Sequence, residues 1–174
     1  VTPGTTFMIE LDQRLRDYIA KRFTSRNPDN PWKHLRVLYS GVQTPGEGEH
    51  KIADYIRFLR SNENYDGKIR HCLYGLDADL FHLALASHEK HIVLFRQEEI
   101  KMTAGKPGSN AVSTFIQVDI ERLRQYILLE YQPVFDNYPE IDLSALNFRI
   151  LDDWVFMNFV IGNDFVGDSI LFQW

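Results

Sequence analysis

The amino-acid sequence predicts an α/β protein with a mostly parallel sheet flanked by helices. Short apolar, β-prone runs alternate with segments whose apolar residues recur at helical spacing, in the order strand, helix, strand, helix, strand. Acidic pairs directly follow two of the predicted strands, at the edge where parallel α/β sheets gather functional groups. With 174 residues, the chain has the size of one domain and can bury a core.

The first third of the chain predicts a helix, a strand and a second helix. Apolar residues recur at helical spacing over residues 8–22, and Thr5 or Thr6 can cap this helix. Residues 35–39 are apolar and β-prone, so they predict a buried strand. After a loop rich in Pro and Gly, residues 52–60 predict a second amphipathic helix.

The middle of the chain predicts two further strands, over residues 69–74 and 91–95, with a helix over residues 80–86 between them. Residues 101–110 are rich in Gly, Pro, Ser and Lys and predict a mobile loop. Residues 115–118 predict a short strand.

Two helices are predicted near the end of the chain. Asp119 can cap the first, which carries Ile120 and Ile127 on its apolar stripe and gives way to a loop over residues 133–140. The second covers residues 146–161 and is expected to be mostly buried. Its predicted apolar stripe consists of Ile150, Trp154, Met157 and Ile161.

Composition restricts the class of protein and its compartment. The formal net charge of −5 argues weakly against nucleic-acid binding, unless bound cations neutralise several acids or a basic surface lies elsewhere in a longer protein. No apolar run reaches the ~18 residues of a membrane span, and the sequence predicts no signal peptide. A single cysteine, Cys72, excludes an internal disulfide and fits a reducing, intracellular compartment. The non-Met start and apolar end predict a piece of a larger protein.

Three acidic clusters predict a site for divalent cations. Glu47 and Glu49 stand among glycines at the start of a helix, Asp77 and Asp79 follow a strand, and Asp164 follows the last helix. Residues two apart in an extended segment point to the same face, so each pair can aim at one ion. Hard cations such as Mg²⁺ prefer carboxylate oxygen, and two ions ~3.5–4 Å apart can activate water against a phosphodiester.

Electrostatic repulsion between these acids is the main argument for bound cations. Two unit charges ~6 Å apart repel by roughly 3 kcal/mol at an effective dielectric constant of 20, and five clustered carboxylates form about ten pairs. Even after screening, the sum rivals the ~5–15 kcal/mol stability of a domain. If the acids converge, they therefore bind cations or hold protons.

Each cluster taken alone has a plainer interpretation. An Asp-x-Asp sequence after a strand is most often a helix cap or turn, and Glu47 and Glu49 suit a first helical turn because of the helix dipole. Asp164 alone would belong to an ordinary loop at a helix end. His50 would by default be a solvated helix residue, and Cys72 a buried strand residue.

Taken together, three motifs resemble the XRN-type 5′→3′ exoribonucleases. They are Pro-Gly-Glu-Gly-Glu-His-Lys-Ile at residues 45–52, His-Cys-Leu-Tyr-Gly-Leu-Asp-Ala-Asp-Leu at residues 71–80, and Asp-Asp-Trp followed by Val-Ile-Gly-Asn-Asp-Phe within residues 152–165. The resemblance covers nearly the whole chain. It implies part of a three-layer core of the PIN and flap-endonuclease-like kind, here as a partial nuclease domain over residues 1–174.

The resemblance also implies a mechanism and a substrate: removal of nucleotides from single-stranded RNA with a 5′-monophosphate, by water and two Mg²⁺ or Mn²⁺ ions. The implied catalytic, metal-binding residues are Glu47, Glu49, Asp77, Asp79 and Asp164. Further metal-binding aspartates and the 5′-phosphate pocket belong to a family segment absent from this chain, so the isolated chain is expected to be inactive or nearly so. The resemblance also implies decapping or RNA-decay proteins as partners, and it implies no association with a membrane.

Two departures and two alternatives remain. Phe81 and His82 stand where the family has an aliphatic pair, and residues 166–170 differ from the family pattern. The resemblance implies that the nuclear branch of the family often carries a Cys-rich zinc knuckle after the third strand. Residues 101–110 contain no Cys, which favours the cytoplasmic branch. The alternatives to the exoribonuclease are a flap-type structure-specific nuclease and an inactive RNA-binding or scaffold fragment.

Overall fold

The computed structural model describes residues 4–100, 112–138 and 143–161. The chain divides into two compact units, Val1–Lys51 and Ile52–Trp174. No helix in the described part is long and apolar enough to cross a membrane. The loop predicted over residues 101–110 lies outside the described residues, as do Asp164 and residues 166–170.

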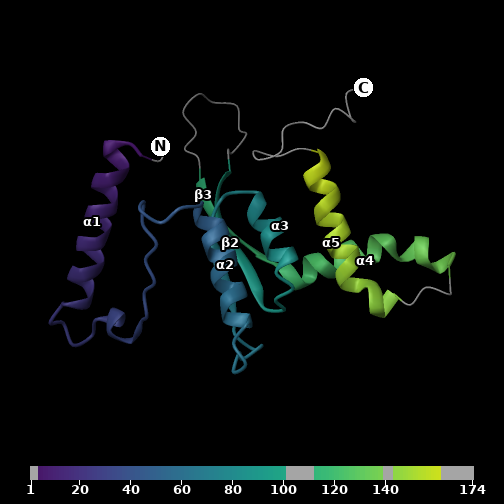
Figure 1. The fold of residues 1–174 in the computed structure, drawn as a ribbon, viewed down its shortest axis with the longest axis horizontal. Coiled ribbons are helices and arrows are strands. Elements are labelled where there is room, and N and C mark those ends of the chain that lie inside the picture. Colours follow the sequence, from purple (N-terminus) through teal and green to yellow (C-terminus); the bar gives the residue numbers. More distant parts are fainter. Residues whose placement is uncertain (1–3, 101–111, 139–142, 162–174) are drawn as a thin grey trace. The chain divides into compact units, whose positions relative to one another are not determined.

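The first unit contains one long helix and a 3₁₀ helix (Figure 1). Helix α1 is Thr6–Phe23, and the side chain of Thr5 accepts a hydrogen bond from the Met8 amide, as the capping prediction required. Helix η1 is Pro31–His34. Edge-to-face ring contacts of Trp32 with Tyr18 and Phe23 pack η1 against the end of α1.

The prediction of a strand over residues 35–39 is wrong. These residues have no regular structure, and Leu35, Val37 and Leu38 are 52%, 42% and 73% exposed. A strand requires a neighbour that accepts and donates its main-chain hydrogen bonds, and the described part of the chain offers this segment none. Its β-prone side chains were therefore insufficient.

The second unit is built on a three-stranded sheet in the order β1-β2-β3. Strand β1 is His71–Tyr74, β2 is Ile92–Ile100 and β3 is Val112–Asp119. β1 and β2 are parallel, whereas β2 and β3 are antiparallel. The α/β class is therefore confirmed, but the described sheet is mixed rather than mostly parallel. The antiparallel pairing of β2 and β3 agrees with their separation in sequence, since β2 ends at Ile100 and β3 begins at Val112. A parallel pair would need a longer crossover connection.

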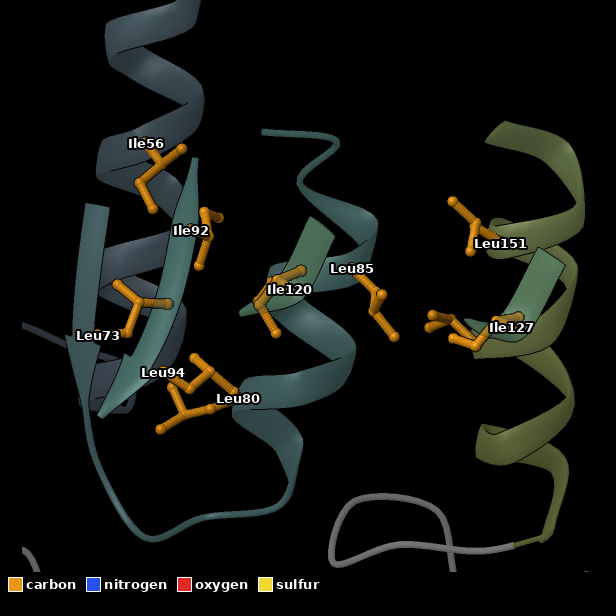
Figure 2. Close-up of a cluster of buried hydrophobic side chains, with 11 residues drawn as sticks. Ile56, Leu73, Leu80, Leu85, Ile92, Leu94, Ile120, Ile127 and Leu151 are labelled. Carbon is orange, nitrogen blue, oxygen red and sulfur yellow. The ribbon is translucent and has the colours of Figure 1, made fainter. Parts of the chain in front are cut away.

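Helices cover one face of this sheet in layers (Figure 1). Helix α3, Asp79–Ala86, and helix α4, Ile120–Asp136, pack on the sheet, and helix α5, Leu143–Ile161, packs on α3 and α4. Helix α2, Gly48–Arg60, begins in the first unit and contributes Ile56 to the core of the second. Figure 2 shows Leu85 of α3 between the sheet residues and Leu151 of α5. The remaining labelled core residues are Leu73, Leu80, Ile92, Leu94, Ile120 and Ile127.

Two helix predictions need correction. α4 continues through Pro133 to Asp136 instead of ending in a loop at residue 133. The amides of Asn137 and Tyr138 bond the carbonyls of Val134 and Phe135, so the last turn closes in spite of the proline.

Among the α5 residues whose burial is described, Leu151 and Val155 are buried, whereas Met157 of the predicted stripe is 55% exposed. This helix is apolar nearly all round, so its periodicity did not distinguish one face from another.

The predicted cap of α4 is confirmed. The side chain of Asp119 accepts hydrogen bonds from the Glu121 and Arg122 amides.

Candidate metal site

The Glu47–His50 cluster, made of Glu47, Glu49 and His50, forms where α2 begins. One carboxylate oxygen from each glutamate and one ring nitrogen of His50 lie within 4.8 Å of one another. Glu47 is exposed, while Glu49 and His50 are half-buried. The described chain thus places three groups that could bind one metal ion on a single short stretch.

Local geometry explains why these side chains gather. Gly46 has φ of +94°, a left-handed conformation that glycine adopts without strain. The chain therefore turns sharply just before Glu47. The Glu47 carbonyl accepts a hydrogen bond from the Lys51 amide at 3.0 Å, and α2 starts there. The positive end of the helix dipole also favours both carboxylates at this point, as the plainer interpretation holds.

The loop that leads into this cluster is anchored to α1 within the same unit. Asp12 is buried, and its carboxylate accepts hydrogen bonds from Arg16 Nε at 2.8 Å, the Tyr39 hydroxyl at 2.8 Å and the Val42 amide at 3.2 Å. The hydrogen bond from Arg16, followed by that from Tyr39, lowers the pKa of Asp12 below its usual 3.8. A carboxylate that stays charged thus holds residues 39–42.

Asp77 and Asp79 lie in the second unit, at the carboxyl end of β1. Asp77 is exposed and Asp79 is half-buried at the first position of α3. The Asp77 side chain accepts a hydrogen bond from the Asp79 amide at 3.1 Å. This is the turn contact of the plainer interpretation, and it leaves other carboxylate oxygens available.

The prediction that these two aspartates share a face because the segment is extended is wrong. Ala78 has φ −70° and ψ −29°, which is helical, and the Phe81 amide already bonds the Ala78 carbonyl at 3.0 Å. Asp77 and Asp79 therefore flank a tight turn into α3. Their proximity comes from this turn, not from strand alternation.

The five predicted acids are thus placed in part. The structure brings Glu47 and Glu49 together, and it puts Asp77 and Asp79 on one turn. These pairs belong to different units, and Asp164 lies outside the described residues. The convergence of all five on one pair of ions stays a prediction.

Three neighbours of these acids were not predicted from the sequence. His50 joins the first cluster, although its position on a helix suggests a solvated residue. His82 Nδ1 lies 3.8 Å from Asp79 Oδ1, and its ring faces Trp154 and Phe159 of α5. Arg96 of β2 donates to the carbonyl of Leu76, next to Asp77. The signal for His50 was its adjacency to Glu49, whereas only the fold brings Arg96 to the aspartates.

Cys72 also differs from its expected environment. It is exposed, not buried. β1 has one face toward the helices, carried by Leu73, and Cys72 lies on the opposite face. An apolar strand sequence does not reveal that only one of its faces is covered in the described structure.

The donor atoms suit a hard divalent cation. Carboxylate oxygens are preferred by Mg²⁺ and Mn²⁺, while an imidazole suits later transition metals. Two carboxylates in the Glu47–His50 cluster and two at the start of α3 thus fit the chemistry of phosphodiester hydrolysis by metal-activated water. The class of protein defined here is that of α/β proteins with carboxylate-rich candidate positions for divalent cations, one pair of carboxylates in each unit.

Comparison with known proteins gives the family. A family model described as XRN 5′-3′ exonuclease N-terminus matches residues 1–98, more than half of the chain. The chain is 39% identical over 170 residues to 5′-3′ exoribonuclease 1 of Saccharomyces cerevisiae, and 38% identical over 171 residues to 5′-3′ exoribonuclease 1 of Homo sapiens. It is also 38% identical over 183 residues to 5′-3′ exoribonuclease 2 of Debaryomyces hansenii. This chain belongs to the XRN 5′-3′ exonuclease family.

The matches cover 95% of this chain but only 10% of the yeast and human exoribonuclease 1 proteins and 17% of the Debaryomyces exoribonuclease 2. The resemblance drawn from the three motifs is therefore confirmed at the level of family. The activity of such a whole protein is a separate question.

Proposed function

We propose that this chain is part of the catalytic core of a metal-dependent 5′→3′ exoribonuclease. The observation that carries the proposal is that relatives 38–39% identical over 95% of the chain are named 5′-3′ exoribonucleases. The carboxylates at the start of α2 and α3 would supply the metal ligands that such an activity requires, which supports the proposal. In this proposal the core has the three-layer PIN-like architecture, with residues 1–174 as one portion of it.

The proposed substrate is single-stranded RNA with a 5′-monophosphate, and the proposed cofactors are two Mg²⁺ or Mn²⁺ ions. Glu47, Glu49, Asp77, Asp79 and Asp164 would hold the ions. When bound, the ions would activate a water molecule and stabilise the leaving oxygen. Asp77 keeps its carboxylate exposed while its turn contact fixes the backbone, as expected of a residue that meets ions from solvent.

The decisive test uses the full-length protein that carries this segment. Asp77→Asn is expected to lower the turnover of 5′-monophosphorylated RNA by at least about 100-fold, because loss of outer-shell partners alone costs 10–100-fold. Asp66→Asn is the matched control: its side chain accepts the amide of Lys68 two residues on, as Asp77 accepts that of Asp79, but it stands in an exposed turn before β1. Unchanged turnover in Asp77→Asn would exclude the proposed role.

Substrate competition separates the alternatives. An exoribonuclease is expected to degrade single-stranded RNA with a 5′-monophosphate and to spare a branched DNA flap, and chelation of divalent ions is expected to stop it. Preferred cleavage of the flap would favour the flap-type nuclease. RNA binding without cleavage by the full-length protein would favour the scaffold.

We further propose that the protein is cytoplasmic, because residues 101–110 contain no cysteine, and that it has decapping or RNA-decay partners, as the family resemblance implies. Named relatives include both exoribonuclease 1 and exoribonuclease 2 at similar identity, so the comparison does not separate the two. Fluorescence microscopy of the tagged full-length protein tests the location, and nuclear accumulation would contradict it.

A further inference from the structure

Arg96 of β2 lies beside the turn that carries Asp77 and Asp79. β1 and β2 run parallel as far as the pair Tyr74 and Phe95, and the Gly75 amide then bonds the Phe95 carbonyl at 3.2 Å. The chain leaves the sheet at this point. Arg96 is the next residue of β2, so its side chain starts where the turn begins.

The guanidinium of Arg96 contacts the chain on both sides of the two aspartates. Its Nη2 donates to the Leu76 carbonyl at 2.9 Å, one residue before Asp77. Its central carbon lies 5.6 Å from the ring centroid of Phe81, two residues after Asp79, in a cation–π arrangement. One side chain therefore spans the turn from its entry to the first turn of α3.

The turn is tightly packed, so a shift of the backbone at its start would also move Asp77 and Asp79. A Cβ added at Gly75 would lie 2.4 Å from Leu80 Cδ1, which shows how closely the start of α3 folds back on the end of β1. Leu80 is packed in the core on one side and the Leu76 carbonyl is hydrogen-bonded on the other, so residues 77–79 are anchored at both ends.

Among the described residues, the acidic side chain that lies within ion-pair distance of Arg96 is that of Glu98, and not that of Asp77 or Asp79. Arg96 Nε lies 3.4 Å from Glu98 Oε1, close enough for an ion pair, although this buried Nε makes no hydrogen bond among the described residues. The hydrogen bond from its Nη2 goes to a main-chain carbonyl. Arg96 can thus hold the backbone of the turn while leaving carboxylate oxygens of Asp77 and Asp79 available to cations.

We infer that Arg96 is a positioning residue that holds Asp77 and Asp79 in place for metal binding. The inference rests on the proposed function. Arginine suits this role because its planar guanidinium can hydrogen-bond a carbonyl and stack on an aromatic ring at once, which a lysine ammonium cannot do in one geometry. The opposing interpretation is that Arg96 only stabilises the sheet edge, in which case its loss lowers stability but not metal affinity.

The test compares Arg96→Met with Arg122→Met in the full-length protein. Arg122 is an exposed arginine of α4 and serves as the matched control. Arg96→Met is expected to raise the Mg²⁺ concentration for half-maximal RNA hydrolysis about 10–100-fold, the range typical of lost outer-shell support. The KM for RNA is expected to stay within about twofold, and Arg96→Lys to recover part of the loss. Arg122→Met is expected to match the unmodified protein.

A second measurement separates positioning from folding. Mn²⁺ binding is titrated by electron paramagnetic resonance on folded protein, with thermal unfolding recorded in parallel. Weaker Mn²⁺ binding by folded Arg96→Met supports the inference, and unchanged Mn²⁺ binding overturns it whatever happens to stability. Glu98→Gln is expected to keep the Mn²⁺ affinity, and a loss equal to that of Arg96→Met would show that the ion pair, not the Leu76 contact, matters.

The two proposals fail in distinguishable ways. If Asp77→Asn is fully active, the proposed function fails and takes the role of Arg96 with it. If Asp77→Asn is inactive while Arg96→Met keeps its Mg²⁺ dependence and Mn²⁺ affinity, only the inference about Arg96 fails.

Discussion

Gly46 is the residue on which the geometry of the Glu47–His50 cluster depends. Its φ of +94° is accessible to glycine but strained for residues with a Cβ. Gly48, two residues on, has no atom within 4 Å of the place a Cβ would take and no positive φ, and it starts α2. The two glycines therefore differ in what a methyl group would do, although the sequence presents them alike.

Gly46→Ala and Gly48→Ala form a matched pair. Gly46→Ala is expected to cost about 1 kcal/mol or more of stability and to weaken Mn²⁺ binding, because the turn before Glu47 must open. Gly48→Ala is expected to be neutral or to stabilise by up to about 1 kcal/mol, since alanine favours a helix. Thermal unfolding and Mn²⁺ titration measure both, and equal effects of the two changes would contradict the assignment.

Asp12 gives the first unit a defined response to acid. Since its pKa is lowered in the folded state, chiefly by the hydrogen bond from Arg16, its stabilising contribution is complete above the ordinary value of 3.8. It is lost as pH falls below 3.8 through the lower folded-state pKa. The hydrogen bonds from the Tyr39 hydroxyl and the Val42 amide weaken with it.

Asp12→Asn is expected to be less stable than the unmodified protein at pH 7, with a difference that narrows as pH falls from about 4 toward 2. Thermal unfolding followed by circular dichroism at several pH values measures this. Asp17→Asn on the same helix is the control, because Asp17 is exposed and accepts a hydrogen bond from Gln13, one turn earlier in α1. If the difference in stability between Asp12→Asn and the unmodified protein stayed constant across this pH range, the protonation of Asp12 would not be its cause.

At the scale of elements, α3 is held at both ends. At its start, the turn with Asp77 and Asp79 is supported by Arg96. At its end, Arg124 of α4 is 4% exposed and donates to the carbonyls of Ala84 at 2.9 Å and Leu85 at 3.4 Å. A buried guanidinium thus takes the place of water at the helix terminus, where the dipole also favours a cation.

Arg124→Met is expected to lower the free energy of unfolding by about 2–4 kcal/mol, because buried carbonyls lose charged hydrogen-bond donors. Arg122→Met, two positions away and exposed, is expected to stay within about 0.5 kcal/mol. Urea unfolding measures both variants. A small effect of Arg124→Met would mean that water reaches these carbonyls. Since Arg124 acts at the opposite end of α3 from Asp79, its loss is not expected to mimic Arg96→Met in metal titration.

At the scale of the whole molecule, the charge of −5 and the clustered carboxylates lead us to expect that added Mg²⁺ raises the unfolding temperature of the protein. A ligand that binds only the folded state stabilises by about 2.7 kcal/mol at 100 times its dissociation constant. This corresponds to a rise of roughly 5–10 °C in the unfolding temperature for a chain of this size. Thermal unfolding with added Mg²⁺ measures the rise, and sodium chloride at equal ionic strength is the control for charge screening. An equal rise with sodium chloride would contradict specific binding of Mg²⁺.

Double variants test whether the acids of the two units share ions. If Glu47 and Glu49 converge with Asp77 and Asp79, changing either pair to the corresponding amides is expected to abolish the whole Mg²⁺-dependent rise. If each pair binds alone, each double variant is expected to lose only part of it. A full rise in both double variants would exclude these carboxylates as the source.

Much of this protein follows from its sequence alone, because it depends on interactions between near neighbours. Helical spacing and the caps Thr5 and Asp119 predicted α1 and α4, and three local motifs predicted the family. The proximity of Glu47 and Glu49 also follows from short-range spacing, helped by Gly46.

Only the tertiary structure decided what depends on distant partners. Residues 35–39 are β-prone yet unpaired in the described chain, and the position of β3 made the sheet mixed. The buried stripe of α5 was set by α3 and α4, and Arg96 reached the turn of Asp77 from a separate strand. Strand pairing, helix burial and support of a site are formed by contacts between separate elements, and local propensity carries no information about which elements will meet.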